Sequence, residues 1–145
     1  MKNFGKKFLC ILFSLCVLTN LAGAAAIDGR SSLYLDGYSA TLTAKRGGKI
    51  VVTVDISGRG YMEEIGTTKI YIYESRNNTS FKRVETYKCD DYPIMMSSGT
   101  VYYEDAATYV GKPGYYYKAS VYCYAGDGTN GDERNYTTAA VKALA

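Results

Sequence analysis

Residues 113–125, PGYYYKASVYCYA, alternate between two sets of side chains after a Pro-Gly turn. One side carries Tyr115, Tyr117, Ala119, Val121, Cys123 and Ala125, and the other carries Tyr116, Lys118, Ser120, Tyr122 and Tyr124. A two-residue period of this length predicts a β-strand with one buried face. Turn residues fill 126–135, and a second alternation follows at Thr137, Ala139, Val141 and Ala143. The two segments together predict a terminal β-hairpin.

Upstream of this hairpin, further strand-like stretches alternate with turn-forming residues. The stretches are residues 33–44, 49–57, 67–74, 81–89 and 100–109. The expected turns and loops are Asp36-Gly37, KRGG at 45–48, SGRGYMEEIG at 57–66, Asn77-Asn78 and the irregular segment 90–99. No stretch of ten or more residues combines helical periodicity with capping signals. About seven short strands at this spacing predict an all-β fold, an antiparallel β-sandwich.

The first twenty-six residues have the pattern of a secretory signal peptide. Lys2, Lys6 and Lys7 precede an apolar run at 8–21, and small residues follow at 22–26. Cleavage after Ala24 or after Ala26 satisfies the small-x-small rule equally well. An uncleaved membrane anchor is the alternative, but the run is shorter than the roughly 20 residues that a spanning helix needs. We therefore predict a secreted protein with residues 27–145 as its single domain.

The charge of the mature chain is close to zero, although the whole sequence carries +3. Its three surplus lysines all lie in the predicted signal segment, so fourteen basic residues face fourteen acidic ones from Ile27 onward. Nucleic-acid binding leaves a basic footprint, and none is present. No segment after residue 26 is apolar enough to span a bilayer. We expect neither nucleic acid nor, after signal removal, membrane as a partner.

Two cysteines remain after the predicted cleavage, Cys89 and Cys123. In an exported protein such a pair predicts a disulfide, with two separate buried thiols as the alternative. The chain contains no histidine, so a two-thiol zinc site would lack ligands and a catalytic cysteine would lack its base. We expect no metal or cofactor here.

The strand at 113–125 and the residues before it carry a resemblance. Val110, Lys112-Pro113-Gly114, Tyr117, Ala119, Val121 and Cys123 resemble strand F of fibronectin type III and related immunoglobulin-like domains. The resemblance implies that Tyr117 is the corner tyrosine, whose hydroxyl bonds to backbone near the turn. The sequence departs from that family in having no tryptophan, and Cys123 stands where a small residue is usual.

Most of the mature chain is also similar to a group of small secreted proteins from Gram-positive gut bacteria. The similar segments are GYMEEIGTTKIYIYE at 60–74, TYVGKPGYYYKASVYCYAGDG at 108–128 and ERNYTT at 133–138. That group has no assigned function, so this similarity implies no particular chemistry.

Sixteen tyrosines with no tryptophan are the compositional feature most relevant to function. We expect six of them to share the outward face of one sheet: Tyr71, Tyr73, Tyr116, Tyr122, Tyr124 and Tyr136. The cations Lys69, Lys118, Arg134 and Lys142 would lie between them. Such a surface fits a platform that binds glycan or peptide, because tyrosine is favoured in binding surfaces. The alternative is cross-strand aromatic pairing that only stabilises an exposed sheet.

Other side chains suggest weaker candidate sites. Asp127, Asn130, Asp132 and Glu133 could bind Ca²⁺, but their spacing departs from the twelve-residue calcium loop and suits a hairpin turn equally well. The pairs Glu63-Glu64 and Asp90-Asp91 could supply carboxylates for glycoside hydrolysis. Adjacent carboxylates on loops are more often simply solvated.

The sequence lacks the usual parts of an enzyme: histidine, a phosphate-binding loop and a nucleophile elbow. We predict no catalytic residues. The expected function is non-covalent binding of an extracellular or cell-surface glycan or protein. The alternatives are a secreted inhibitor that uses loops such as 58–66, and a structural envelope component joined through strand edges.

Overall fold

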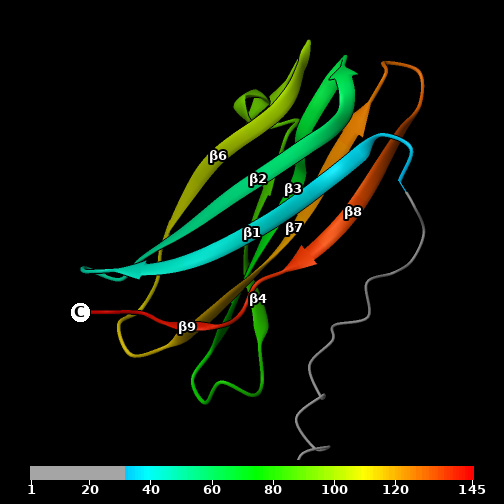
Figure 1. Ribbon diagram of the computed structural model, residues 1–145. Coiled ribbons are helices and arrows are strands. Elements are labelled where there is room, and N and C mark those ends of the chain that lie inside the picture. Colours follow the sequence, from blue (N-terminus) through cyan, green and yellow to red (C-terminus); the bar gives the residue numbers. More distant parts are fainter. Residues whose placement is uncertain (1–31) are drawn as a thin grey trace, which may run out of the picture. The chain divides into compact units, whose positions relative to one another are not determined.

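The computed structural model describes residues 32–145, and these form two packed antiparallel β-sheets (Figure 1). The predicted signal peptide, residues 1–26, lies outside the described residues. The three-stranded sheet has the order β1 (Leu35–Lys45), β2 (Lys49–Met62), β6 (Thr100–Val110). The long strands of the other sheet have the order β4 (Lys82–Lys88), β3 (Glu64–Ser75), β7 (Tyr116–Gly126), β8 (Gly131–Thr137).

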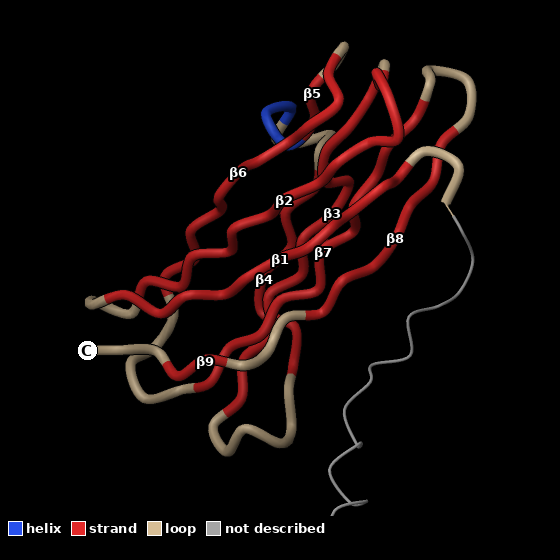
Figure 2. Tube along the Cα trace, viewed as in Figure 1, coloured by secondary structure: helices blue, strands red, loops and turns tan. Residues whose placement is uncertain are grey.

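Two short strands complete the second sheet. β5 (Met96–Ser97) pairs with β3, and β9 (Val141–Lys142) pairs with β7. A single 3-10 turn, η1 (Pro93–Met95), precedes β5 and is the one helical segment of the described chain (Figure 2). Seven long strands therefore confirm the all-β sandwich. The order of the strands in the two sheets is compatible with an immunoglobulin-like sandwich.

The core lies between the two sheets and consists of the inward side of each alternation. β2 contributes four β-branched side chains, Ile50, Val52, Val54 and Ile56, all at most 2% exposed. β7 contributes Tyr117, Ala119, Val121, Cys123 and Ala125, all fully buried. Side chains that alternate in this way bury one face of each strand and leave the other to solvent.

Three of the expected turns and loops are strands instead. Asp36-Gly37 is a bulge at the start of β1, where Leu35 pairs with Gly58 and Gly37 with Ser57. The expected loop at 57–66 continues β2 to Met62 and begins β3 at Glu64, so two strands meet there at one residue, Glu63. The turn after β7 is only 127–130, and pairing resumes at Gly131. Polar and glycine residues at these places fit bulges and strand ends as well as loops.

The last segment is also shorter than expected. The alternation at Thr137, Ala139, Val141 and Ala143 is interrupted after Thr137, and the chain resumes as β9 beside the first residues of β7. Thr138 is buried and its hydroxyl accepts the backbone N–H of Ala119 at 3.0 Å. The Thr138 hydroxyl thus takes the place of a backbone carbonyl in the hydrogen bonding to β7, and the chain changes register between β8 and β9.

Candidate functional site

The outer face of the larger sheet carries five of the six expected tyrosines. Tyr71 and Tyr73 project from β3, and Tyr116, Tyr122 and Tyr124 from β7. All five are half-buried, and all except Tyr116, which follows the partly buried Tyr115, lie between two buried neighbours. The two strands pair in register, with Lys69 opposite Tyr122 and Tyr73 opposite Lys118. Directly opposite residues share a face, so these side chains form one surface, which we call the aromatic face.

The rings at the centre of the aromatic face pack edge to face. The ring centroids of Tyr71 and Tyr122 are 5.5 Å apart at 74°, and those of Tyr71 and Tyr73 are 6.5 Å apart at 86°. These geometries are the favoured ones for aromatic pairs. Both pairings are therefore part of the folded sheet and hold the three rings in fixed positions.

Cations lie over or beside these rings. Arg83 of β4 lies 4.8 Å from the Tyr71 centroid, and Lys69 lies 5.5 Å from that of Tyr122. Lys118 lies between two rings, 5.9 Å from Tyr73 and 4.5 Å from Phe81. Such contacts are worth about 0.5–1 kcal/mol at exposed sites.

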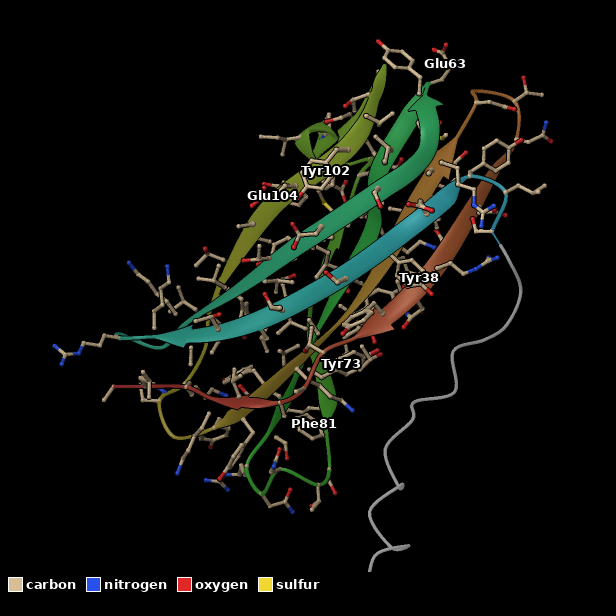
Figure 3. The ribbon with its side chains drawn as sticks, viewed as in Figure 1. Tyr38, Glu63, Tyr73, Phe81, Tyr102 and Glu104 are labelled. Atoms are coloured by element: carbon tan, nitrogen blue, oxygen red, sulfur yellow. The ribbon has the colours of Figure 1, made fainter. Side chains whose placement is uncertain are left out.

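Arg83 and Phe81 were missed in the sequence analysis. The pairing of neighbouring strands is the signal that could have found Arg83, because Arg83 of β4 lies opposite Tyr73 of β3. Figure 3 shows Phe81 below Tyr73 at the end of the sheet, whereas Tyr102 and Glu104 belong to β6 of the other sheet.

Tyr136 does not belong to this face. It pairs with the inward-facing Val121, and its ring contacts Tyr38 of β1 at 6.4 Å and 88°. Arg134 pairs with Cys123 and has the same orientation. The prediction failed because β8 starts its pairing at Gly131, and a one-residue change of register moves every side chain to the other face.

Tyr124 is on the aromatic face but is engaged in the β7–β8 turn. A Cβ atom added to Gly126 or Gly131 would meet its hydroxyl at 2.5 and 2.3 Å. Burial raises the pKa of Tyr124, and Glu64 and Asp127 raise it further. This ring packs over the glycines of the turn, so the accessible centre of the face consists of Tyr71, Tyr73 and Tyr122.

Beyond Phe81, the sheet ends in an open pocket of about 650 Å³. The β3–β4 loop and the β6–β7 loop form its walls. Its charged and aromatic lining residues are Glu74, Arg76, Phe81, Lys82, Lys112 and Tyr115. We call it the end pocket.

A buried carboxylate lies at the inner wall of the end pocket. Glu74 is 4% exposed and accepts hydrogen bonds from the Tyr117 hydroxyl at 2.7 Å and from Lys112 Nζ at 3.3 Å. Burial alone would raise the pKa of Glu74, but these two donors outweigh it and hold the pKa below its ordinary value. Tyr117 also accepts the backbone N–H of Lys112 at 2.8 Å, which is the corner bond that the fibronectin resemblance implies.

The predicted disulfide is wrong: Cys89 and Cys123 are both free thiols. The backbone N–H of Cys89 bonds to Thr68, and Cys123 pairs with Thr67 from the opposite side. β3 therefore lies between the two cysteines. Strands two positions apart are about 9–10 Å apart, whereas a disulfide needs Cα atoms within about 7 Å.

The acidic residues of the β7–β8 turn are used to build the fold. Asp127 accepts the N–H groups of Thr129 and Asn130, and Asp132 accepts Ser32 Oγ and the N–H of Leu33. Within residues 32–145, no group of three or more His, Cys, Asp or Glu side chains is placed to hold a metal ion. These bonds are those of an Asx turn and a clamp on the first residues of the domain.

No helix in the described part of the chain is long and apolar enough to cross a membrane. The chain matches no protein-family model, no curated protein and no solved structure. The strand arrangement and the side-chain geometry are therefore the basis for inferring function, and the similarity to the secreted bacterial group stays a prediction.

Proposed function

We propose that this protein is an exported binding module that holds a glycan chain non-covalently on its aromatic face. The observation that carries the proposal is the fixed cluster of Tyr71, Tyr73 and Tyr122, with cations at its edges. A sugar ring has C–H faces that pack on aromatic rings, and hydroxyls that pair with charged and phenolic donors. The cluster supplies both kinds of contact on one surface.

The hydroxyl groups of the cluster are free to bind such a ligand. Across residues 32–145, the phenol oxygens of Tyr71, Tyr73 and Tyr122 make no hydrogen bond to protein, unlike those of Tyr34, Tyr102 and Tyr117. A phenol that is hydrated in the free protein can exchange its bound water for a ligand hydroxyl at little cost in free energy. A rigid tyrosine also loses little side-chain entropy on binding.

The opposite face of the sandwich differs in composition. The outer face of β1 and β2 carries Thr41 and Thr43 opposite Thr53 and Val51. These four short side chains carry neither rings nor charges. The ring and the carboxylates on the same outer face, Tyr102, Asp55 and Glu104, are already bonded to one another, since the Tyr102 hydroxyl lies 2.7 Å from Asp55 and 3.5 Å from Glu104. The difference predicts that glycan binding is confined to the larger sheet, and it supplies a matched control.

The test is a glycan array followed by calorimetric titration with the best ligand. The variant Tyr71→Leu/Tyr122→Leu keeps apolar cross-strand packing but removes the aromatic rings and their hydroxyls. The control Thr41→Leu/Thr53→Leu makes the same number of changes on the other sheet. We expect the affinity of the first variant for the glycan to fall at least tenfold and the control to bind like the parent. Circular dichroism should show that both variants are folded.

Two results would overturn the proposal. One is a parent that binds no glycan on the array. The other is a folded Tyr71→Leu/Tyr122→Leu variant that binds with the parent's affinity. Loss of thermal stability without loss of binding would assign the rings to cross-strand pairing alone.

A further inference from the structure

The end pocket adjoins the aromatic face. Lys118 is shared between them, since its Nζ lies near both Tyr73 and the pocket residue Phe81. The volume of about 650 Å³ is within the range of roughly 300–1,000 Å³ found for small-molecule sites. A chain that lies along the aromatic face toward Phe81 therefore reaches a concave site at the end of the sheet.

The pocket carries an excess of positive charge. Its one carboxylate, Glu74, is ionised and already paired with Lys112, at 3.3 Å, and with Tyr117. This is the one ion pair within residues 32–145. Arg76 and Lys82 line the same pocket and have no carboxylate within 4 Å in that part of the chain. The two unpaired cations make the pocket attractive to an anion.

Aromatic rings border the charged part of the pocket. Arg76 and Lys112 both lie over the Tyr115 ring, at 5.5 and 5.4 Å from its centroid. Phe81 forms another wall. A ligand in this pocket would meet rings and cations together, as on the aromatic face.

The loop that carries Arg76 is held in one shape before any ligand binds. Asn77 Oδ1 accepts the N–H groups of Thr79 and Ser80, both at 3.1 Å, and the hydroxyl of Ser75 at 2.9 Å. Asn78 takes a left-handed conformation with φ 59°, which asparagine tolerates better than most residues. A preformed loop avoids part of the entropy cost of binding.

We infer that the end pocket binds the carboxylate-bearing residue of an acidic glycan, with Arg76 and Lys82 as the carboxylate ligands. This inference rests on the proposed function, because the aromatic face is what directs a glycan, rather than an acidic peptide, into the pocket. Arg76 offers a planar pair of N–H donors that matches a carboxylate, and Lys82 adds a compact charge.

The experiment is a titration of the purified protein with three probes. The first is a tetrasaccharide that contains glucuronate, the second is the same tetrasaccharide with its carboxyl groups reduced to alcohols, and the third is a tetra-aspartate peptide. The pocket variant is Arg76→Gln/Lys82→Gln. The control is Lys45→Gln/Arg46→Gln, which removes the same charge from the exposed β1–β2 turn.

We expect the parent and the control to bind the acidic tetrasaccharide at least tenfold more tightly than the reduced one. The pocket variant should bind both equally, at the level of the reduced probe. Equal affinity of the parent for both sugars would overturn the inference and leave the proposed function standing. Failure of both sugars to bind would overturn the inference, and the proposed function would fall with it only if the parent also bound no glycan on the array.

Two further outcomes also contradict the inference. Tetra-aspartate binding as tight as that of the acidic sugar would identify the pocket as a site for acidic peptides. An equal loss of affinity in the pocket variant and in the turn control would show a general effect of net charge, with no specific site. Added salt weakens such a general attraction steeply.

Discussion

The phenol oxygen of Tyr117 lies 2.7 Å from Oε2 of Glu74, and both side chains are buried. The same oxygen accepts the backbone N–H of Lys112. One hydroxyl group thus connects β7, β3 and the β6–β7 loop. Its bond to Glu74 fixes the position of the inner wall of the end pocket. The corner is therefore at once a stabilising element of the sandwich and a support for the proposed binding site.

The variant Tyr117→Phe should lose about 2–4 kcal/mol of unfolding free energy. The change removes the donor to a buried carboxylate and the acceptor of a backbone N–H, and leaving such groups unpaired is costly. Urea unfolding monitored by circular dichroism measures the loss. Tyr61→Phe, at a side chain 73% exposed, should change stability by less than about 0.5 kcal/mol. A loss below 1 kcal/mol in Tyr117→Phe would contradict this role.

The variant Gly111→Ala should be destabilised by about 1–3 kcal/mol through overpacking. A Cβ atom at Gly111 would lie 2.5 Å from Cζ of Tyr117 and 2.8 Å from its hydroxyl. Gly60→Ala is the matched control, because a Cβ atom there meets nothing within 4 Å. Thermal unfolding of the two variants compares them directly, and equal melting temperatures would rule out a tight contact at the corner.

The alternation of residues was sufficient to predict the sandwich and the aromatic face. Tyr71, Tyr73 and Tyr122 each lie between buried neighbours on a strand of period two, so their outward orientation follows from the sequence. The corner role of Tyr117 was implied by the resemblance of residues 110–123 to strand F of fibronectin type III domains, and the Lys112 N–H does bond to its hydroxyl. The orientation of the three rings depends on residues within one strand.

The errors concern relationships between strands. The side on which Tyr136 lies depends on the exact length of the turn before β8, and the spacing of Cys89 and Cys123 depends on β3 lying between them. The end pocket was missed for a similar reason. Arg76 and Lys112 lie in two different loops, where no periodic pattern exists and only the strand order brings the loops together.

The thiol chemistry of the folded protein should distinguish the two cysteines. Burial raises the pKa of Cys123 to about 12, and the side chain is fully buried, so iodoacetamide should modify it only after unfolding. Cys89 is half-buried at the end of β4 and should react in the native state. Peptide mapping by mass spectrometry, without added reductant, identifies both. Recovery of a peptide pair linked through Cys89 and Cys123 would contradict the free-thiol state.

Acid should weaken the fold in part through Asp132. The hydrogen bond from Ser32 is the main reason that its pKa lies below the ordinary value of 3.8, and the N–H groups of Leu33 and Tyr34 lower it further. Because the folded pKa is the lower one, this carboxylate stabilises the fold above about pH 3.8 and loses that contribution as pH falls through the folded pKa.

The measurement is the urea midpoint of the parent and of Asp132→Asn between pH 6 and pH 2.5. We expect the variant to be less stable at pH 6 and the two midpoints to converge in acid, where the parent carboxylate is also neutral. Asp127 and Glu74 also have lowered pKa values, so the variant should keep part of the acid sensitivity. Asp36→Asn, at an exposed carboxylate that makes no hydrogen bond within residues 32–145, is the control and should follow the parent. A constant gap between Asp132→Asn and the parent at every pH would show that the charge of Asp132 does not hold the first residues of the domain.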